Sequence, residues 1–285
     1  AVNAACYIQA RDLFQLLLGM CTSLNDGSKL LRAECMCMTA LLIVRFGVRP
    51  HNKKDPDMQE AKILLETALQ SLKVKAEATY KPPSNVFKPP IRPNSAKRKS
   101  EPTSDPAQLE TTDEIRKQLL VALAQHILGL RICILEARKG LADPKQLSEA
   151  AWYAQEAIAV RDYRGDVAGQ SDSLNLAGEI ARLQAKQHGA SAMEDPQGQA
   201  LLIKAQQSFE KAYNLRHENQ DPQLAQSLMS LGTLFFLDKK DNRTAKWYFQ
   251  LALDEYENVE MHHKTPNALV PLSDIAAAEE NIREA

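Results

Sequence analysis

One helical signature recurs along this chain at a regular interval. A small, a large and a small residue at Ala205, Phe209 and Ala212 return 40 positions later (245 − 205 = 40) as Ala245, Phe249 and Ala252. The same spacing occurs earlier, at Ala150, Ala154 and Ala157 and at Ala61, Leu65 and Ala68. A repeat of about 30–45 residues built on one helical signature is typical of an array of stacked helix pairs. The chain is therefore expected to stack helices rather than to form a sheet.

Composition agrees with an all-α fold. The 285 residues are 44% apolar and 25% charged, with 11 glycines, and long segments are rich in the helix-favouring residues Ala, Leu, Gln, Glu and Lys. The formal net charge of −1 does not favour nucleic acid or an anionic membrane as the main partner. The five cysteines lie in apolar helical stretches and are expected to be reduced thiols rather than a disulfide framework.

Three regions follow from the distribution of apolar residues and prolines. Residues 1–79 are expected to form N-terminal helical repeats, with helices at 5–18, 29–46 and 57–78. Residues 80–112 hold seven prolines among basic and hydroxyl residues, which predicts a disordered insertion or linker, open to a docking or regulatory role. Residues 113–285 are expected to be helical repeats, the last one truncated. The helices are expected at 113–137, 145–161, 171–187, 198–217, 223–237, 241–257 and 267–285.

Residues 222–257 resemble a tetratricopeptide repeat. Its first helix (helix A) would supply Leu228, Leu231, Gly232 and Phe235, and its second (helix B) Ala245, Phe249 and Ala252. The long repeats, of about 40–44 residues, are most similar to the kinesin-light-chain variety of this family. Leu174, Ala177, Gly178 and Ala181 resemble another helix A, and Leu128 with Gly129 a third. The resemblance implies a right-handed superhelical solenoid of antiparallel helix pairs.

No assembled catalytic or metal-binding motif was found in the sequence. Phosphate-binding, serine-hydrolase and zinc-protease motifs are absent. Cys35 and Cys37 are not followed by a second cysteine pair, and the adjacent His262 and His263 do not share a helical face. We therefore expect no catalytic residue, metal or cofactor, no small-molecule substrate and no direct binding of nucleic acid. No apolar run is expected to span a membrane.

The family resemblance also implies where a partner would bind. In tetratricopeptide arrays helix A lines the concave groove, and seven positions here match that face: Asn175, Glu179, Arg182, Gln226, Met229, Thr233 and Phe236. Met229 and Phe236 are expected to be apolar anchors, and Asn175 and Arg182 orienting polar groups. Glu179 and the lack of lysines disfavour the clamp by which chaperone-binding members hold a terminal carboxylate.

These features predict a non-enzymatic scaffold or adaptor within a complex, whose groove binds an extended or helical segment of a partner protein. The alternative is a helical-repeat regulatory or sensor region of a larger enzyme or signalling protein. The chain begins without Met inside a helical pattern, so it is expected to be a fragment. We expect the protein to lie in an intracellular, reducing compartment, and in the cytoplasm rather than the nucleus. A location in an organelle is the remaining alternative.

Overall fold

The computed structural model describes residues 29–46, 56–72, 112–139, 141–189 and 195–284, together with residues 12, 13, 16, 19 and 20. Within these residues every regular element is a helix, which confirms the all-α prediction. The expected insertion at 80–112 lies outside the described residues except for Thr112. So do most of the helix expected at 5–18 and the last residues of the helix expected at 57–78.

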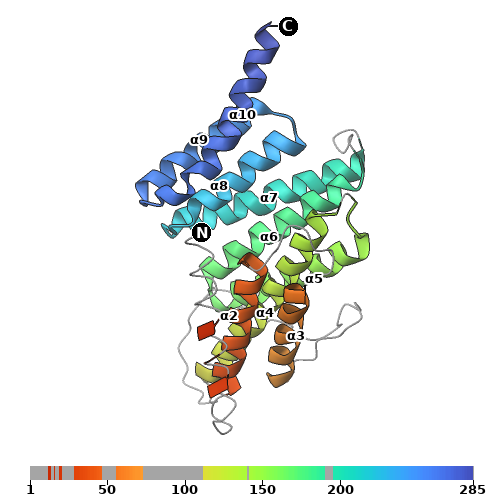
Figure 1. Cartoon of the computed structure of the whole chain (residues 1–285), viewed down its shortest axis with the longest axis vertical. Helices are drawn as coiled ribbons and strands as arrows, with labels where there is room; N and C mark the ends of the chain where they lie inside the picture. Colours follow the sequence, from red (N-terminus) through yellow and green to blue (C-terminus); the bar gives the residue numbers. More distant parts are fainter. Residues whose placement is uncertain are drawn as a thin grey trace, which may run out of the picture. The chain divides into compact units, whose positions relative to one another are not determined.

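The chain divides into two compact units (Figure 1). The first comprises Ala1–Leu128 and Ala159–Gly165, and the second comprises Gly129–Ile158 and Asp166–Ala285. The division passes through two helices, α4 (Thr112–Ala137) and α5 (Pro144–Arg164).

In the first unit, α2 (Lys29–Phe46) packs against α3 (Pro56–Ser71). The earliest copy of the repeated signature, Ala61, Leu65 and Ala68, lies on α3 and is completely buried. Cys35 and Cys37 on α2 are buried as well, and both are free thiols. Arg116 at the start of α4 forms an ion pair with Glu34 of α2.

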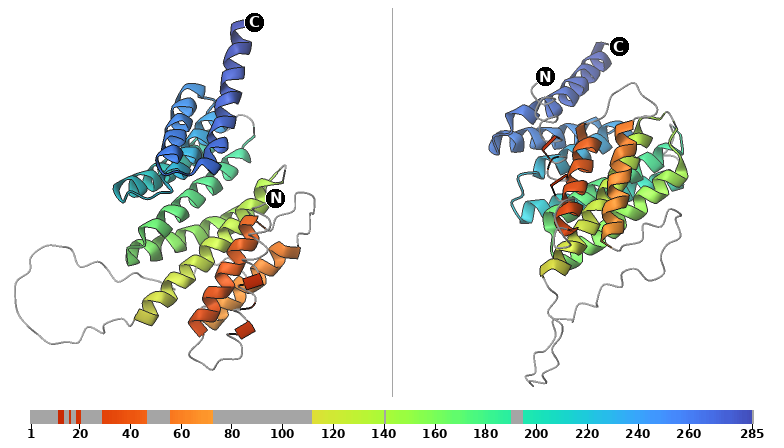
Figure 2. Two further views of the ribbon diagram at one scale, coloured as in Figure 1. Left: turned by 60° about the vertical axis from the view of Figure 1, so that its left-hand side comes forward. Right: turned by 60° about the horizontal axis from the view of Figure 1, so that its bottom comes forward.

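The second unit continues as a series of helices that pack on their neighbours in the chain (Figures 1 and 2). They are α6 (Val167–Lys186), α7 (Pro196–Glu218), α8 (Leu224–Thr233), the π-helical η2 (Leu234–Asp238), α9 (Asn242–Asn258), the 3-10 helix η3 (His262–Lys264) and α10 (Thr265–Glu284). α6 packs on α7, α8 on both α7 and α9, and α10 on α9.

Three aspartates begin helices in the same way. The side chains of Asp166, Asp195 and Asp241 each accept a hydrogen bond from the backbone amide three residues later, at distances of 3.0, 2.8 and 3.0 Å. Each thereby satisfies an amide that has no partner inside its helix. Capping by Asp166 explains why α6 begins at Val167, four residues before the start that the apolar pattern predicts.

The cap at Asp241 is expected to contribute measurably to stability. Hydrogen bonds from the hydroxyl and amide of Thr244 lower the pKa of Asp241, so the cap is intact at neutral pH and is lost as the pH falls through this lowered pKa. Asp241→Ala should lower the free energy of unfolding by about 1 kcal/mol at pH 7, measured by urea denaturation. Asp241→Asn, which keeps an acceptor, should lose much less. Equal losses in the two variants would contradict the capping role.

The repeated signature forms the contacts between helices. Ala150, Ala154, Ala157, Ala205, Phe209, Ala212, Ala245 and Ala252 are completely buried, and Phe249 is 1% exposed. The Phe249 ring lies against Gly232 of α8 so closely that a Cβ there would meet ring carbons at 2.6 and 2.7 Å. Phe209 lies against Gly178 of α6 in the same way. Each phenylalanine therefore occupies the space that a glycine leaves on the preceding helix.

Three apolar clusters follow one another through these helices. The first joins α6, α7, α8 and η2 through Ala181, Ala185, Leu202, Ala205, Phe209, Leu231 and Leu234. The second joins α8 and α9 through Ala225, Leu228, Ala252 and Tyr256. The third joins α9 to α10 through Ala245, Phe249 and Ile275. Because each cluster shares a helix with the next, the core continues from α6 to α10.

Candidate partner-binding face

The seven predicted groove residues lie on α6, α8 and η2, and their surroundings differ. Asn175 and Arg182 are each only 5% exposed. Gln226 is exposed, whereas Glu179, Met229, Thr233 and Phe236 are half-buried. The structure thus separates residues that hold the helices together from residues that solvent reaches.

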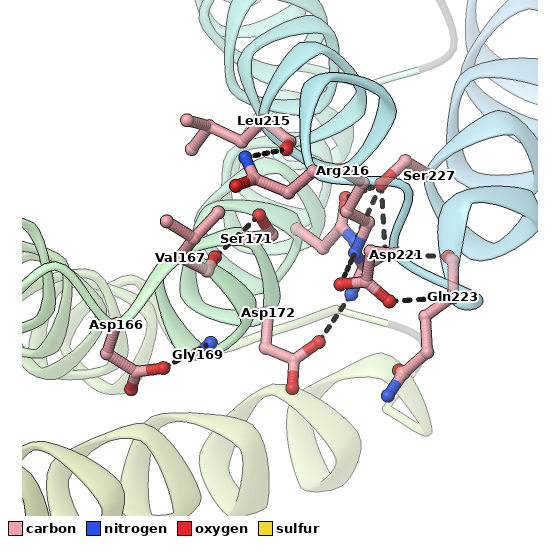
Figure 3. A network of polar contacts seen from close by, with 12 residues as sticks. Asp166, Val167, Gly169, Ser171, Asp172, Leu215, Arg216, Asp221, Gln223 and Ser227 are labelled. Atoms are coloured by element: carbon pink, nitrogen blue, oxygen red, sulfur yellow. Dashed lines mark hydrogen bonds and ion pairs between the residues drawn. The ribbon is translucent and has the colours of Figure 1, made fainter.

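Arg216, at the end of α7, is the largest completely buried side chain in the described part of the protein. Its guanidinium donates hydrogen bonds to the hydroxyl of Ser227 (3.0 Å) and to the carbonyl of Gln223 (3.2 Å), and it forms an ion pair with Asp172 of α6 (Figure 3). Its Nε also lies 3.7 Å from a carboxylate oxygen of Asp221. One side chain of α7 therefore connects α6, the following loop and α8.

Asn175 belongs to the same polar cluster. Its side-chain amide donates to the hydroxyl of Ser227 at 3.2 Å. The expected role of Asn175 as an orienting group for a partner stays a prediction, but in this structure its amide bonds to α8. Ser227, which is completely buried, joins Asn175 to Arg216.

Arg182 connects the other end of α6 to η2. Its Nε donates to Asp238 at 2.5 Å, and its Nη1 donates to Glu179 at 2.9 Å. The side chains of Arg182 and Asp238 are 6% and 7% exposed, whereas that of Glu179 is 37% exposed. Asp238 was not among the predicted groove residues. No local pattern indicates it, because its partner lies 56 residues earlier in the chain.

The end of α8 changes from α-helical to π-helical geometry, which the periodic pattern did not predict. In η2 the amide of Lys239 donates to the carbonyl of Leu234, five residues earlier. A π turn inserts one residue relative to an α turn, so the side chains that follow are displaced from their α-helical directions. Phe236 packs edge-on against Phe249, and Leu237 is 44% exposed. Leu237 is a surface residue that was not among the predicted groove positions.

Met229 and Phe236, the expected apolar anchors, contact the protein's own core. Both lie against the cluster of Ala245, Phe249 and Ile275 at the α9–α10 contact. Met229 also lies against the preceding cluster of α8 and α9. Substituting either residue would alter packing inside the protein, so neither is a clean probe of partner binding.

Four residues on α6, α8 and η2 are exposed or half-buried and could contact a partner. We call them the α6–α8 face: Glu179, Gln226, Thr233 and Leu237. Gln226 and Thr233 are seven residues apart and so lie on one side of α8, and Leu237 follows in η2. The hydroxyl of Thr233 donates to the carbonyl of Met229, so the methyl group of Thr233 is the part that can contact a partner. This methyl group is a smaller apolar contact than the side chain of Leu237. The face therefore combines an amide, a leucine and a carboxylate.

Trp247 is an exposed aromatic residue outside the α6–α8 face. It is 57% exposed on α9 and contacts the ring of Tyr248 edge-on at 4.7 Å between centroids. Tyr248, its neighbour, makes the inward contact by stacking on Phe235.

Cys35, Cys37, Cys133 and His126 are buried. No group of three or more His, Cys, Asp or Glu side chains able to hold a metal ion occurs among the described residues. Burial raises the pKa of Cys37 and of Cys133 to about 12, so both thiols stay protonated at neutral pH. Burial, reinforced by Arg161 and Arg45, lowers the pKa of His126 to about 3. These groups suit a packed interior.

α4 bears on the expectation that no segment spans a membrane. Among the described residues it is the one helix that is long and apolar enough to cross a bilayer, although the sequence analysis expected none. In the structure 67% of its apolar segment is buried inside the protein. A buried core helix meets the same criteria of length and composition, so α4 is weak evidence for a membrane span.

This sequence matches no protein-family model and no curated protein at a significant level.

Proposed function

We propose that this protein is a non-enzymatic scaffold or adaptor whose α6–α8 face binds an extended or helical segment of a partner protein. In this proposal the helices from α4 onward form a right-handed array of tetratricopeptide-like pairs. The observation that carries it is the repeated contact of Phe209 with Gly178 and of Phe249 with Gly232, by which α6 packs on α7 and α8 on α9 in the same way. Helix arrays of this kind present extended surfaces for protein segments.

The buried polar contacts support the same function. Asn175 and Arg182 bond to α8 and η2, so α6 and α8 are fixed relative to each other before any partner arrives. A preorganised surface loses less conformational entropy on binding than a mobile one. Asn175 and Arg182 thus act behind the face, while Glu179, Gln226 and Leu237 are available to contact the partner.

Leu237 provides the test, because its removal should weaken binding without disturbing the core. Peptides selected from a random 12-residue library against the full chain should bind Leu237→Ser about tenfold more weakly, since about 1–2 kcal/mol of apolar burial is lost. Isothermal titration calorimetry measures this change. Ile203→Ser is the matched control, because Ile203 is 47% exposed but lies on α7.

Gln226→Trp offers a second, steric test of the same face. The larger ring should also weaken peptide binding, since Gln226 lies open to solvent on α8. A library that yields no binding peptide, or peptides that bind Leu237→Ser and Gln226→Trp as well as the wild type, would overturn the proposed function.

A further inference from the structure

The cluster around Arg182 carries more negative than positive charge. Arg182 and Asp238 form a short ion pair and are both nearly inaccessible to solvent. Glu179 is a second carboxylate on the same guanidinium, at 2.9 Å. These three groups alone carry one negative charge in excess, which the nearby Lys186 offsets in part.

Glu179 lies where that excess charge is costly to the free protein. Burial, the largest influence, raises the pKa of Glu179, and the nearby Asp238 raises it further, while Arg182 and Lys186 lower it. Yet 37% of the side chain remains accessible to solvent. The carboxylate is thus enclosed by protein and open on one side. The buried ion pair of Arg182 with Asp238 is a separate contact from that of Arg182 with Glu179.

A second carboxylate on α6 has the same arrangement. Asp172 is 27% exposed and is held from the inside by the completely buried Arg216, which also lies near Asp221. Asp172 and Glu179 are seven residues apart, so they lie on the same side of α6, about 10 Å apart along the axis. Each is fixed by an arginine that already has another carboxylate beside it.

An exposed apolar side chain accompanies these charges. Leu237 directly precedes Asp238 in η2, and Asp238 is the residue that bonds to Arg182. An apolar contact beside fixed carboxylates suits a segment that carries both a hydrophobic residue and a cation. Lys186 is exposed near the end of α6 and offsets part of the negative charge there.

We propose that the partner segment is basic, and that one of its lysine or arginine side chains pairs with Glu179 while a neighbouring apolar residue contacts Leu237. The proposal rests on the proposed function of the α6–α8 face. A second basic residue would reach Asp172 if it lay about three residues away in an extended segment, or seven in a helical one. The incoming cation would balance the excess charge that the free protein carries at Glu179.

The composition of peptides selected on the full chain tests this inference. Peptides from the random 12-residue library should be enriched in Lys and Arg, with an apolar residue nearby. A selected peptide should bind Glu179→Gln about tenfold more weakly than the wild type, because a charge-assisted hydrogen bond is lost. Its affinity for the wild type should fall with added salt more steeply than its affinity for the variant.

Glu156→Gln is the matched control for Glu179→Gln. Glu156 lies on α5, is half-buried and also has its pKa raised by burial, so this substitution changes a similar carboxyl group away from the α6–α8 face. It should leave peptide affinity unchanged. Thermal unfolding of Glu179→Gln should resemble that of the wild type, because the buried pair of Arg182 and Asp238 remains.

The outcomes distinguish the two proposals. Peptides that depend on Leu237 but carry no excess of Lys or Arg, or that are acidic, would overturn the basic partner and leave the scaffold function standing. Basic peptides that bind Glu179→Gln and the wild type equally would do the same. Failure of Leu237→Ser and Gln226→Trp to weaken any peptide would overturn both.

Discussion

Gly178→Ala should destabilise the protein by about 2 kcal/mol, although alanine is the better helix former. Alanine should favour α6 by about 1 kcal/mol on propensity alone. Its Cβ, however, would meet two ring carbons of Phe209 at 2.7 Å and a third still closer. Phe209 is completely buried, so its ring has little room to move, and overpacking of this kind typically costs about 1–3 kcal/mol. The steric term exceeds the propensity term.

A double-mutant cycle isolates that steric contact. In a Phe209→Ala background, which alone should cost about 3–5 kcal/mol, Gly178→Ala should be neutral or stabilising. Ala177→Gly measures the propensity term at the neighbouring position of the same helix. Urea denaturation gives all four free energies. If Gly178→Ala stabilises the wild type, or if the two substitutions are additive, Phe209 does not occupy the space beside Gly178 as the structure shows.

The sequence predicted this contact surface because its cause is local. A small residue that allows close approach and a large one that fills the gap must recur at helical spacing wherever helix pairs stack alike. The signature residues on α3, α5, α7 and α9 are accordingly buried. The start of α5 was predictable for a similar reason, because proline at the first helical position needs no amide partner, whereas α7 begins at Pro196, before the expected start at 198.

The polar residues were harder to predict because their partners are distant in sequence. Helical periodicity places Asn175 and Arg182 on one side of α6, but it does not show that Ser227 and Asp238 lie close enough to bond with them. The π turn at Leu234–Asp238 adds a second difficulty. It shifts the positions of Phe236, Leu237 and Asp238 from those that a continuous α-helix would give. Glu179 is half-buried and Gln226 is exposed, and their role in binding a partner stays a prediction.

Arg216→Met should lower the free energy of unfolding by about 3 kcal/mol, the second large effect. Methionine fills part of the same volume, but the substitution removes the donors to Ser227 and Gln223 and the cation beside Asp172. Loss of one member of a buried ion pair typically costs about 3–5 kcal/mol. The lower value applies because Asp172 is 27% exposed and can recover contact with water. Arg216→Lys should lower the free energy of unfolding nearly as much, since a single ammonium group cannot reproduce the planar arrangement of donors in a guanidinium.

The consequence for the α6–α8 face is specific, because Arg216 connects α6 to α8 through α7. Its loss should reduce hydrogen-exchange protection in α8 and α9 more than in α2 and α3, which lie in the other compact unit. Peptide affinity should fall in Arg216→Met even at temperatures where the protein stays folded, because α6 and α8 are no longer held at a fixed separation. Lys211→Met, an exposed substitution on the same helix, should change neither property. Unchanged exchange in α8 with a large loss of global stability would show that Arg216 supports the fold as a whole rather than the contact between these helices.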